Sequence, residues 1–297
     1  MQIRFGFEIE IDCAKPVPML AALSTHAAAE GRMLGEDRVR AEPDIPLHAY
    51  IDGFGNRVTR LVAPGGPLRL WSDCVVAIEG APDAFEPGAR QHPVEELPDE
   101  ALVYLLPSRY CDSDNLTTMA WERFSGHPAG WMRVQAVCDY VHAQITFGYK
   151  FGRPNKMASE VNFEKTGVCR DFAHLAISLC RALNIPARYA SGYLGDIGAP
   201  DSGPGDFCAW FEVYLGGRWF TFDARYNERR IGRILMVRGR DAADVAMIMS
   251  FGAYDLRYFR VWTDLLEGER DAGAVRRLLA ARPEGEAIVF PDAAAPG

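Results

Sequence analysis

Apolar and polar residues alternate with a period of two at the start of the chain. Over residues 2–12 charged side chains occupy one face, and the other face carries Ile3, Phe5, Phe7, Ile9 and Ile11. This alternation predicts a half-buried antiparallel strand. Two more alternating segments, residues 57–62 and 68–71, flank a Pro-Gly-Gly-Pro turn and predict a hairpin. We therefore expect residues 1–80 to form a β-domain, a small sandwich.

The pattern then changes from strands to helices. Residues 81–100 carry four prolines among acidic residues, which predicts a linker that crosses the surface. Along residues 131–145 apolar side chains recur every three or four positions, as is typical of an amphipathic helix. A second helix is expected from Cys169 to Leu183, and Pro186 ends it because proline cannot continue the hydrogen-bond ladder.

After this helix the period of two returns. Residues 188–193 are predicted to form a strand, and residues 207–215 and 218–224 a hairpin around two glycines. We therefore expect an α+β core with an antiparallel sheet over residues 101–282. Residues 283–297, rich in Ala, Pro and Gly, are expected to be a frayed tail.

The two-residue turn of this hairpin predicts which of its side chains share a face. Pairing the residues on either side of the turn places Asp223 opposite Trp210. Two positions further on, Arg225 lies opposite Cys208. Because side chains alternate, all four point the same way, and Cys208 and Asp223 are diagonal neighbours about 7–8 Å apart at the backbone. We expect Trp210 to form a wall of a cleft there, bordered by the loop of residues 195–205.

Several sequence motifs in the second half of the chain resemble those of one family of cysteine enzymes. In chain order they are Gly167-Val168-Cys169-Arg170-Asp171, Leu183-Asn184-Ile185-Pro186-Ala187-Arg188-Tyr189, Gly192-Tyr193, Ala209-Trp210-Phe211-Glu212-Val213 and Trp219-Phe220-Thr221-Phe222-Asp223. Their order and spacing resemble those of bacterial transglutaminase-like proteins, whose papain-like core follows an N-terminal β-domain. The resemblance implies a Cys–His–Asp triad in which Cys169 is the nucleophile and Asp223 the orienting carboxylate. The histidine that the family places just before Ala209 is Cys208 here.

Cys169 stands at the predicted start of a helix, where chemistry favours its thiolate. Unsatisfied N–H groups and the positive end of the helix dipole lower the pKa of a thiol there. Cys208 can accept a proton only as a thiolate, which the cation of Arg225 would favour. We therefore predict a site of Cys169, Cys208 and Asp223, with Asp171 as a supporting residue.

The histidines of this region do not offer an obvious base. His174 follows Cys169 by five positions, about 140° around the helix, on a polar stripe. We expect His174 to be solvated or to support the site indirectly. His127 is expected in a loop and His142 in a helix, each without a partner that the sequence identifies.

Other interpretations of the two thiols stay open. In one alternative the base is lost and the fold persists as a binding or scaffolding module. Cys169, Cys208 and Asp223 also have the donor types of a zinc site, although no close CxxC or HxH pair supplies a fourth ligand. A Cys169–Cys208 disulfide is a third possibility, as a redox switch or an oxidation product. No cofactor is predicted.

Composition narrows the partners and the compartment. The chain of 297 residues is 48% hydrophobic and 24% charged, which is the balance of a soluble globular protein. A net charge of -8 argues against nucleic acid or an anionic membrane as partner. Seven irregularly spaced cysteines and the lack of a signal-like start predict a cytoplasmic protein. We predict an acyl or amide hydrolase or transferase acting on a small-molecule, peptide or protein amide, of undetermined oligomeric state.

Overall fold

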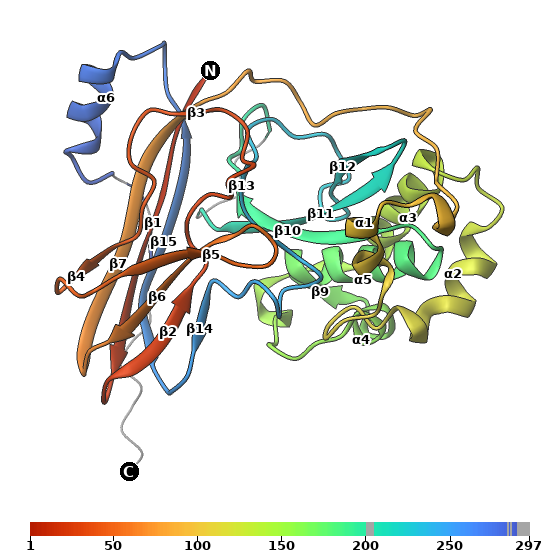
Figure 1. Ribbon diagram of the computed structural model, residues 1–297, viewed down its shortest axis with the longest axis horizontal. Coiled ribbons are helices and arrows are strands. Elements are labelled where there is room, and N and C mark those ends of the chain that lie inside the picture. Colours follow the sequence, from red (N-terminus) through yellow and green to blue (C-terminus); the bar gives the residue numbers. More distant parts are fainter. Residues whose placement is uncertain (200–204, 284, 286, 290–297) are drawn as a thin grey trace.

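The computed structural model describes residues 1–199, 205–283, 285 and 287–289. Figure 1 shows two sheets at one end of the molecule, a group of helices at the other and a further sheet between them. Mixed helices and antiparallel sheets confirm the predicted α+β class. Among the helices described, none is long and apolar enough to cross a membrane. The cytoplasmic location stays a prediction.

The N-terminal segment supplies seven strands. They are β1 (Gln2–Cys13), β2 (Val17–Ala21), β3 (Arg32–Met33), β4 (Arg40–Glu42), β5 (His48–Ile51), β6 (Arg57–Ala63) and β7 (Gly66–Ala77). Three later strands are β14 (Ile248–Ser250), β15 (Asp255–Leu265) and β16 (Ile288–Val289). The larger sheet has the order β16-β15-β1-β7-β3, with β4 also paired to β7, and the smaller has the order β14-β2-β6-β5.

The three late strands correct the predicted domain boundaries. β15 pairs antiparallel with β1 from Ile3↔Leu265 to Asp12↔Asp255, and β14 pairs with β2. The segment 101–282, predicted to be the core, therefore also completes the N-terminal sheets. The alternating pattern of β1 predicts a strand, but it does not reveal which strands pair with its two edges. One partner, β15, is far away in the sequence. β16, which pairs with β15, lies inside the predicted tail, of which residues 284, 286 and 290–297 are outside the described residues.

β1 is more buried than the predicted half-buried strand. Its charged face is covered as well, because Arg4 pairs with Asp73 at 2.6 Å and Glu8 pairs with Arg282 at 2.6 Å. The fully apolar face packs in the main hydrophobic core. Ion pairing satisfies the buried charges, so both faces of this central strand are covered.

The core combines helices with a third sheet. The helices are α1 (Asp99–Leu102), α2 (Thr117–Phe124), α3 (Trp131–Gln144), α4 (Ala158–Glu164), α5 (Cys169–Ala182) and, beside the N-terminal sheets, α6 (Ala272–Leu279). Four short 3₁₀ turns are η1 (Val94–Glu96), η2 (Val103–Leu105), η3 (Ser113–Leu116) and η4 (Tyr149–Phe151). The strands are β10 (Ala187–Tyr193), β11 (Phe207–Leu215), β12 (Arg218–Phe222) and β13 (Ile234–Gly239), in the order β12-β11-β10-β13, all antiparallel. A small parallel pair joins β8 (Thr146–Phe147) to β9 (Thr166–Gly167).

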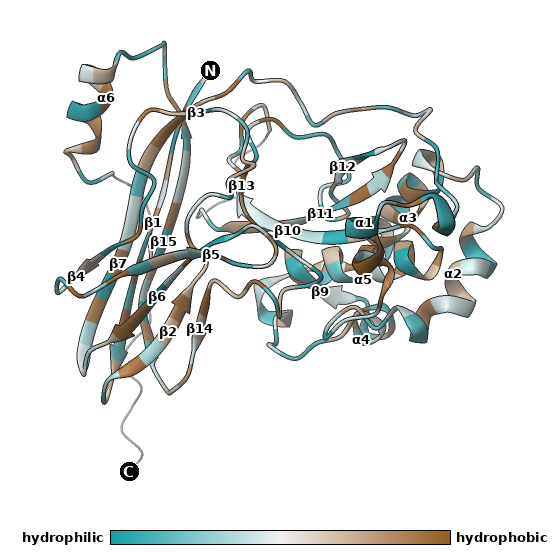
Figure 2. Ribbon diagram, viewed as in Figure 1, coloured by the Kyte–Doolittle hydropathy of each residue, from teal (hydrophilic) through white to brown (hydrophobic). Residues whose placement is uncertain are grey.

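Helix α5 is the central helix of the core. Every residue from Asp171 to Ala182 is buried, and the helix packs on β10 and β11. Figure 2 shows apolar residues along α5 and along the strands of the N-terminal sheets. The polar stripe of α5 is buried too, since the Arg181 guanidinium donates to the carbonyls of Ala187, Leu106 and Arg240. Cys169 thus begins a helix that is enclosed on all sides after its first turn.

Candidate active site

The residues just before α5 fix the position of Cys169. The Val168 N–H donates a 3.0 Å hydrogen bond to the carboxylate of Asp171, which caps the start of the helix. A Cβ on Gly167 would lie 2.7 Å from the Cβ of Asp171, so only glycine fits there without a shift. The thiol therefore occupies the positive end of a helix whose first turn is tightly held.

The surroundings of Cys169 favour its thiolate. A hydrogen bond from the Cys208 thiol lowers the pKa of Cys169, and the Ala209 N–H and the cation of Arg225 act in the same direction. Burial and the negative charge of Asp206 oppose them, but the pKa stays below that of an ordinary cysteine. The predicted low-pKa thiol thus has a structural basis that goes beyond the helix dipole.

Cys208 is a proton donor in this arrangement. Its hydrogen bond to Cys169 raises its pKa well above the usual range, and burial together with the charge of Asp223 adds to the shift. Cys208 is therefore a neutral thiol at neutral pH. Because the loss of a proton from one of two adjacent thiols makes loss from the other unfavourable, this arrangement favours Cys208 as a neutral neighbour of the Cys169 thiolate.

The β11–β12 hairpin has the predicted register along the whole length of β12. However, β12 ends at Phe222, because Asp223 turns the chain. The Asp223 Oδ1 accepts hydrogen bonds from the N–H groups of Arg225 at 2.9 Å and Tyr226 at 3.1 Å. Such a turn competes with strand pairing. The predicted pairing of Arg225 with Cys208 is therefore wrong, although Arg225 stays near both thiols.

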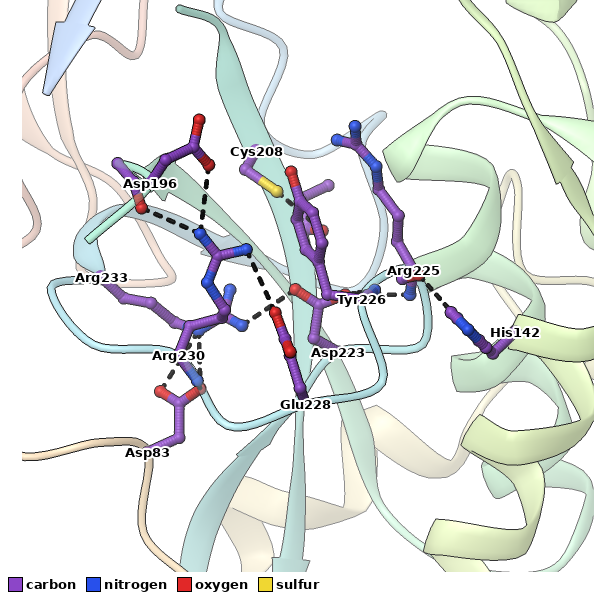
Figure 3. A network of polar contacts seen from close by, with 12 residues as sticks. Asp83, His142, Asp196, Cys208, Asp223, Arg225, Tyr226, Glu228, Arg230 and Arg233 are labelled. Atoms are coloured by element: carbon purple, nitrogen blue, oxygen red, sulfur yellow. Dashed lines mark hydrogen bonds and ion pairs between the residues drawn. The ribbon is translucent and has the colours of Figure 1, made fainter. Parts of the chain in front are cut away.

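Asp223 is held by an arginine that the sequence analysis did not identify. Its Oδ2 accepts a 2.9 Å hydrogen bond from Nη2 of Arg233, whose Nε donates at 2.9 Å to Asp83 (Figure 3). The Arg233 guanidinium also lies 5.0 Å from the ring centre of Trp210. Burial alone would lower the pKa of Arg233, but the two carboxylates raise it. Asp223 is therefore engaged in an ion pair, and not free to orient a base.

Arg225 is fixed from both its side chain and its backbone. Its guanidinium carbon lies 3.7 Å from the ring centre of Phe147 and 4.6 Å from that of Tyr226. Its carbonyl accepts a 2.8 Å hydrogen bond from Nδ1 of His142 (Figure 3). His142, for which the sequence offered no partner, thus positions the backbone beside the thiols.

His174 is buried rather than solvated. Its Nε2 accepts a 3.1 Å hydrogen bond from the Ala242 N–H, and burial lowers its pKa well below the usual range. The ring lies 5.3 Å from each of Tyr110 and Tyr189. The predicted polar stripe is covered by these neighbours, which a helical pattern does not reveal. His174 is a neutral residue that supports two tyrosines.

Cys169 lies in the wall of a cavity of about 610 Å³. β1, β10, β11 and β15 contribute to the wall, and its aromatic residues are Tyr110, Tyr149, Tyr189, Phe207, Tyr254 and Phe259. From β11 the cavity is lined by Phe207 and Ala209, whereas Trp210 lines a separate cavity of about 600 Å³. Strand alternation sends Trp210 to the other face. The prediction that it forms the wall of the cleft is wrong, and residues 200–204 of the bordering loop lie outside the described residues.

A carboxylate that the sequence analysis did not identify borders Cys169. Asp206, one residue before β11, lines the same cavity and accepts a 2.7 Å hydrogen bond from the Phe207 N–H. Burial raises its pKa, while the Phe207 N–H, a hydrogen bond with Tyr149 and the cation of Arg225 oppose the shift. Its position just outside the alternating segment gave no signal in the sequence.

Two alternatives for the thiols were a Cys169–Cys208 disulfide and a zinc site. All seven cysteines are free, including Cys169 and Cys208. Over residues 1–199, 205–283, 285 and 287–289, no group of three or more His, Cys, Asp or Glu side chains is placed to hold a metal ion.

We expect iodoacetamide to label one cysteine of the native protein, Cys169, at neutral pH. The other six thiols are buried, and the lowered pKa of Cys169 makes its thiolate available. The pH at which the labelling rate is half-maximal should lie below the roughly 8.5 of a free cysteine. Peptide mapping after timed quenching measures both site and rate, with Cys169→Ala as the control. A half-maximal pH at or above that of free cysteine contradicts the prediction.

Comparison with known proteins places these features in a family. Residues 118–224 match the sequence profile of the transglutaminase-like superfamily, a range that includes Cys169, Cys208 and Asp223. An uncharacterized protein of Mycobacterium leprae is 27% identical over 235 residues, which are 74% of this chain and 82% of that protein. An uncharacterized protein of Mycobacterium tuberculosis is 39% identical over 101 residues, 29% of this chain and 31% of the relative.

A solved structure matches the whole architecture. The crystal structure of a candidate cysteine protease from Cytophaga hutchinsonii superposes with a TM-score of 0.80 at 28% identity. It covers 93% of this chain and 96% of its own. The N-terminal sheets and the core therefore recur together, with the papain-like fold that the motifs implied.

Proposed function

Because the chain is a protein of the transglutaminase-like superfamily, we propose that it is a cysteine enzyme whose Cys169 attacks an acyl or amide carbonyl. The observation that carries the proposal is the setting of Cys169. Its thiol begins the buried helix α5, has its pKa lowered by the adjacent Cys208 thiol, and lines a cavity of about 610 Å³. A thiolate stabilised in this way is a nucleophile without an adjacent imidazole.

The reaction proceeds through a thioester. The Cys169 thiolate adds to the carbonyl carbon, a C–S bond forms, and the amine or alcohol leaves. Water then hydrolyses the thioester, or an amine takes the acyl group, which distinguishes a hydrolase from a transferase. Cys208 stabilises the thiolate as a donor, and the Asp223–Arg233 ion pair fixes the end of the hairpin next to it.

The cavity favours an apolar or aromatic group on the acyl side of the substrate. Its volume is within the usual range of ligand pockets, and six aromatic side chains line it. Such a wall buries a large apolar side chain, and the two arginines that also line it, Arg153 and Arg170, disfavour a basic one. We therefore propose a peptide or protein amide as substrate, in keeping with the protease description of the similar Cytophaga hutchinsonii structure.

The test is a covalent intermediate on Cys169. The native protein is incubated with N-acyl peptide esters and amides that carry phenylalanine, leucine or lysine at the acyl position, and is quenched in acid. We expect a mass increase equal to the acyl group, mapped to Cys169, together with turnover that is absent in Cys169→Ala. Cys13→Ala, a buried cysteine of β1 outside the site, serves as the matched control.

The alternative, a binding module without chemistry, predicts the opposite. In that case Cys169→Ala would keep any partner binding and cellular phenotype, and no acyl adduct would form on Cys169. Turnover that survives in Cys169→Ala would also overturn the proposal.

A further inference from the structure

The proposed reaction needs a group that moves protons, and the described residues offer few. An amine is a poor leaving group unless its nitrogen is protonated as the C–N bond breaks. Cys208 donates to Cys169, and Asp223 is paired with Arg233. No histidine stands among the described residues that line the cavity, where Asp206 is the only carboxylate.

Asp206 is positioned to serve the reacting carbonyl. It stands immediately before β11, and its Oδ1 is oriented by the 2.7 Å hydrogen bond from the Phe207 N–H. Tyr149 lines the same cavity, and its interaction with the Asp206 carboxylate lowers the pKa of that group. Asp206 is half-buried and close enough to Cys169 for a direct electrostatic interaction. The carboxyl and the thiol therefore share one wall of one cavity.

We propose that Asp206 is the acid–base residue of the Cys169 reaction, in the place of the missing imidazole. This rests on the proposed function. In the resting state the Cys169 sulfur and the Asp206 carboxylate hold one proton between them, and that proton passes to Asp206 as the sulfur attacks. Their like charges resist the loss of that last proton, as in other pairs of adjacent acids.

The proton balance closes over one catalytic cycle. The thiolate of Cys169 adds to the carbonyl carbon, and the carbonyl π electrons move to oxygen. When that oxyanion collapses, the C–N bond breaks and its electron pair takes the proton of Asp206, which releases a neutral amine and leaves a thioester. Asp206, now a carboxylate, removes a proton from water as the water oxygen attacks the thioester. The C–S bond breaks, the acid product leaves, and the pair again holds one proton, which restores the starting state.

The charges around Asp206 are consistent with this role. Burial raises its pKa, whereas Tyr149 and the cation of Arg225 oppose the shift. Arg153 and Arg170 are the other cations that line the cavity, and Cys169 is the facing acid. Asp206 in turn raises the pKa of Cys169. Removing its charge must therefore make the thiol more acidic.

The acid–base role predicts different effects of Asp206→Asn on an ester and on an anilide. The probes are the p-nitrophenyl ester and the p-nitroanilide of N-acetylphenylalanine. The ester has a leaving group that needs no acid, so the pre-steady-state burst of p-nitrophenol, which reports acylation of Cys169 alone, should be unchanged, or faster below neutral pH. Hydrolysis of the anilide should fall by about 10²–10⁴, the usual value of a positioned acid or base. The alkaline limb of the pH profile of kcat/KM for the anilide, which reports loss of the last proton of the pair, should disappear.

Controls separate this inference from the proposed function. Asp206→Glu keeps an acid and should restore part of the anilide rate, and Asp114→Asn, at an exposed carboxylate, should change neither rate. Equal losses on ester and anilide would assign Asp206 a structural role and overturn the inference. An unchanged anilide rate in Asp206→Asn would overturn it too, while the acyl adduct on Cys169 still supports the proposed function. If neither probe gives Cys169-dependent turnover in the wild type, both proposals fail.

Discussion

Replacing Arg233 by methionine is expected to lower the free energy of unfolding by about 3–5 kcal/mol. Its guanidinium is 7% exposed and pairs at 2.9 Å with each of Asp223 and Asp83. Asp223 is itself only 2% exposed at its side chain. Removal of the shared cation leaves two carboxylates in a poorly solvated site, and an uncompensated buried charge costs far more than a lost surface pair.

Urea unfolding at neutral pH, followed by circular dichroism, measures this change. The matched control is Arg218→Met, since Arg218 is 58% exposed and pairs with Glu86 at 2.9 Å. A surface pair of this kind contributes up to about 1 kcal/mol. If Arg233→Met and Arg218→Met cost the same, Asp223 is not held as the structure indicates.

Replacing Cys208 by alanine is expected to raise the pKa of Cys169 and slow its alkylation at neutral pH. The hydrogen bond from Cys208 is the largest of the effects that lower that pKa. A hydrogen bond to a charged group is worth about 1.5–3 kcal/mol, and one pKa unit corresponds to about 1.4 kcal/mol. The thiolate fraction at neutral pH therefore falls, and alkylation of Cys169 should slow about tenfold or more.

The pH dependence of alkylation by iodoacetamide gives the direct readout. Cys208→Ser keeps an O–H donor of similar size and should retain most of the lowered pKa, which separates the hydrogen bond from the packing of the side chain. An unchanged pH dependence in Cys208→Ala would show that Cys208 does not stabilise the thiolate. A shift to lower pH would show that Cys208 itself carries negative charge in the wild type.

Local patterns were sufficient to predict much of the fold. The alternation along β1, the register of the β11–β12 hairpin and the start of α5 at Cys169 were all recoverable, because each follows from a period or a turn. The motifs indicated the superfamily whose sequence profile matches residues 118–224.

What could not be predicted depends on residues that are far apart in the sequence. Asp83 lies in a proline-rich segment with no periodicity, yet its carboxylate accepts from Arg233 across 150 positions. Burial of His174 arises from Tyr110, Tyr189 and Ala242, which no helical pattern indicates. Asp206 acquires its significance from the cavity alone.

The pairing of β15 with β1 has a consequence for how the molecule is made. Residues 2–13 leave the ribosome early, but their partner, residues 255–265, is translated after the whole core. Until then one edge of a long apolar strand stays open to other chains, which favours aggregation. A nascent chain that stops before Asp255 has Cys169 but lacks Leu256 and Phe259 of the cavity wall. Synthesis of residues 255–265 thus supplies the strand that covers β1 and part of the cavity wall beside Cys169 in the same step.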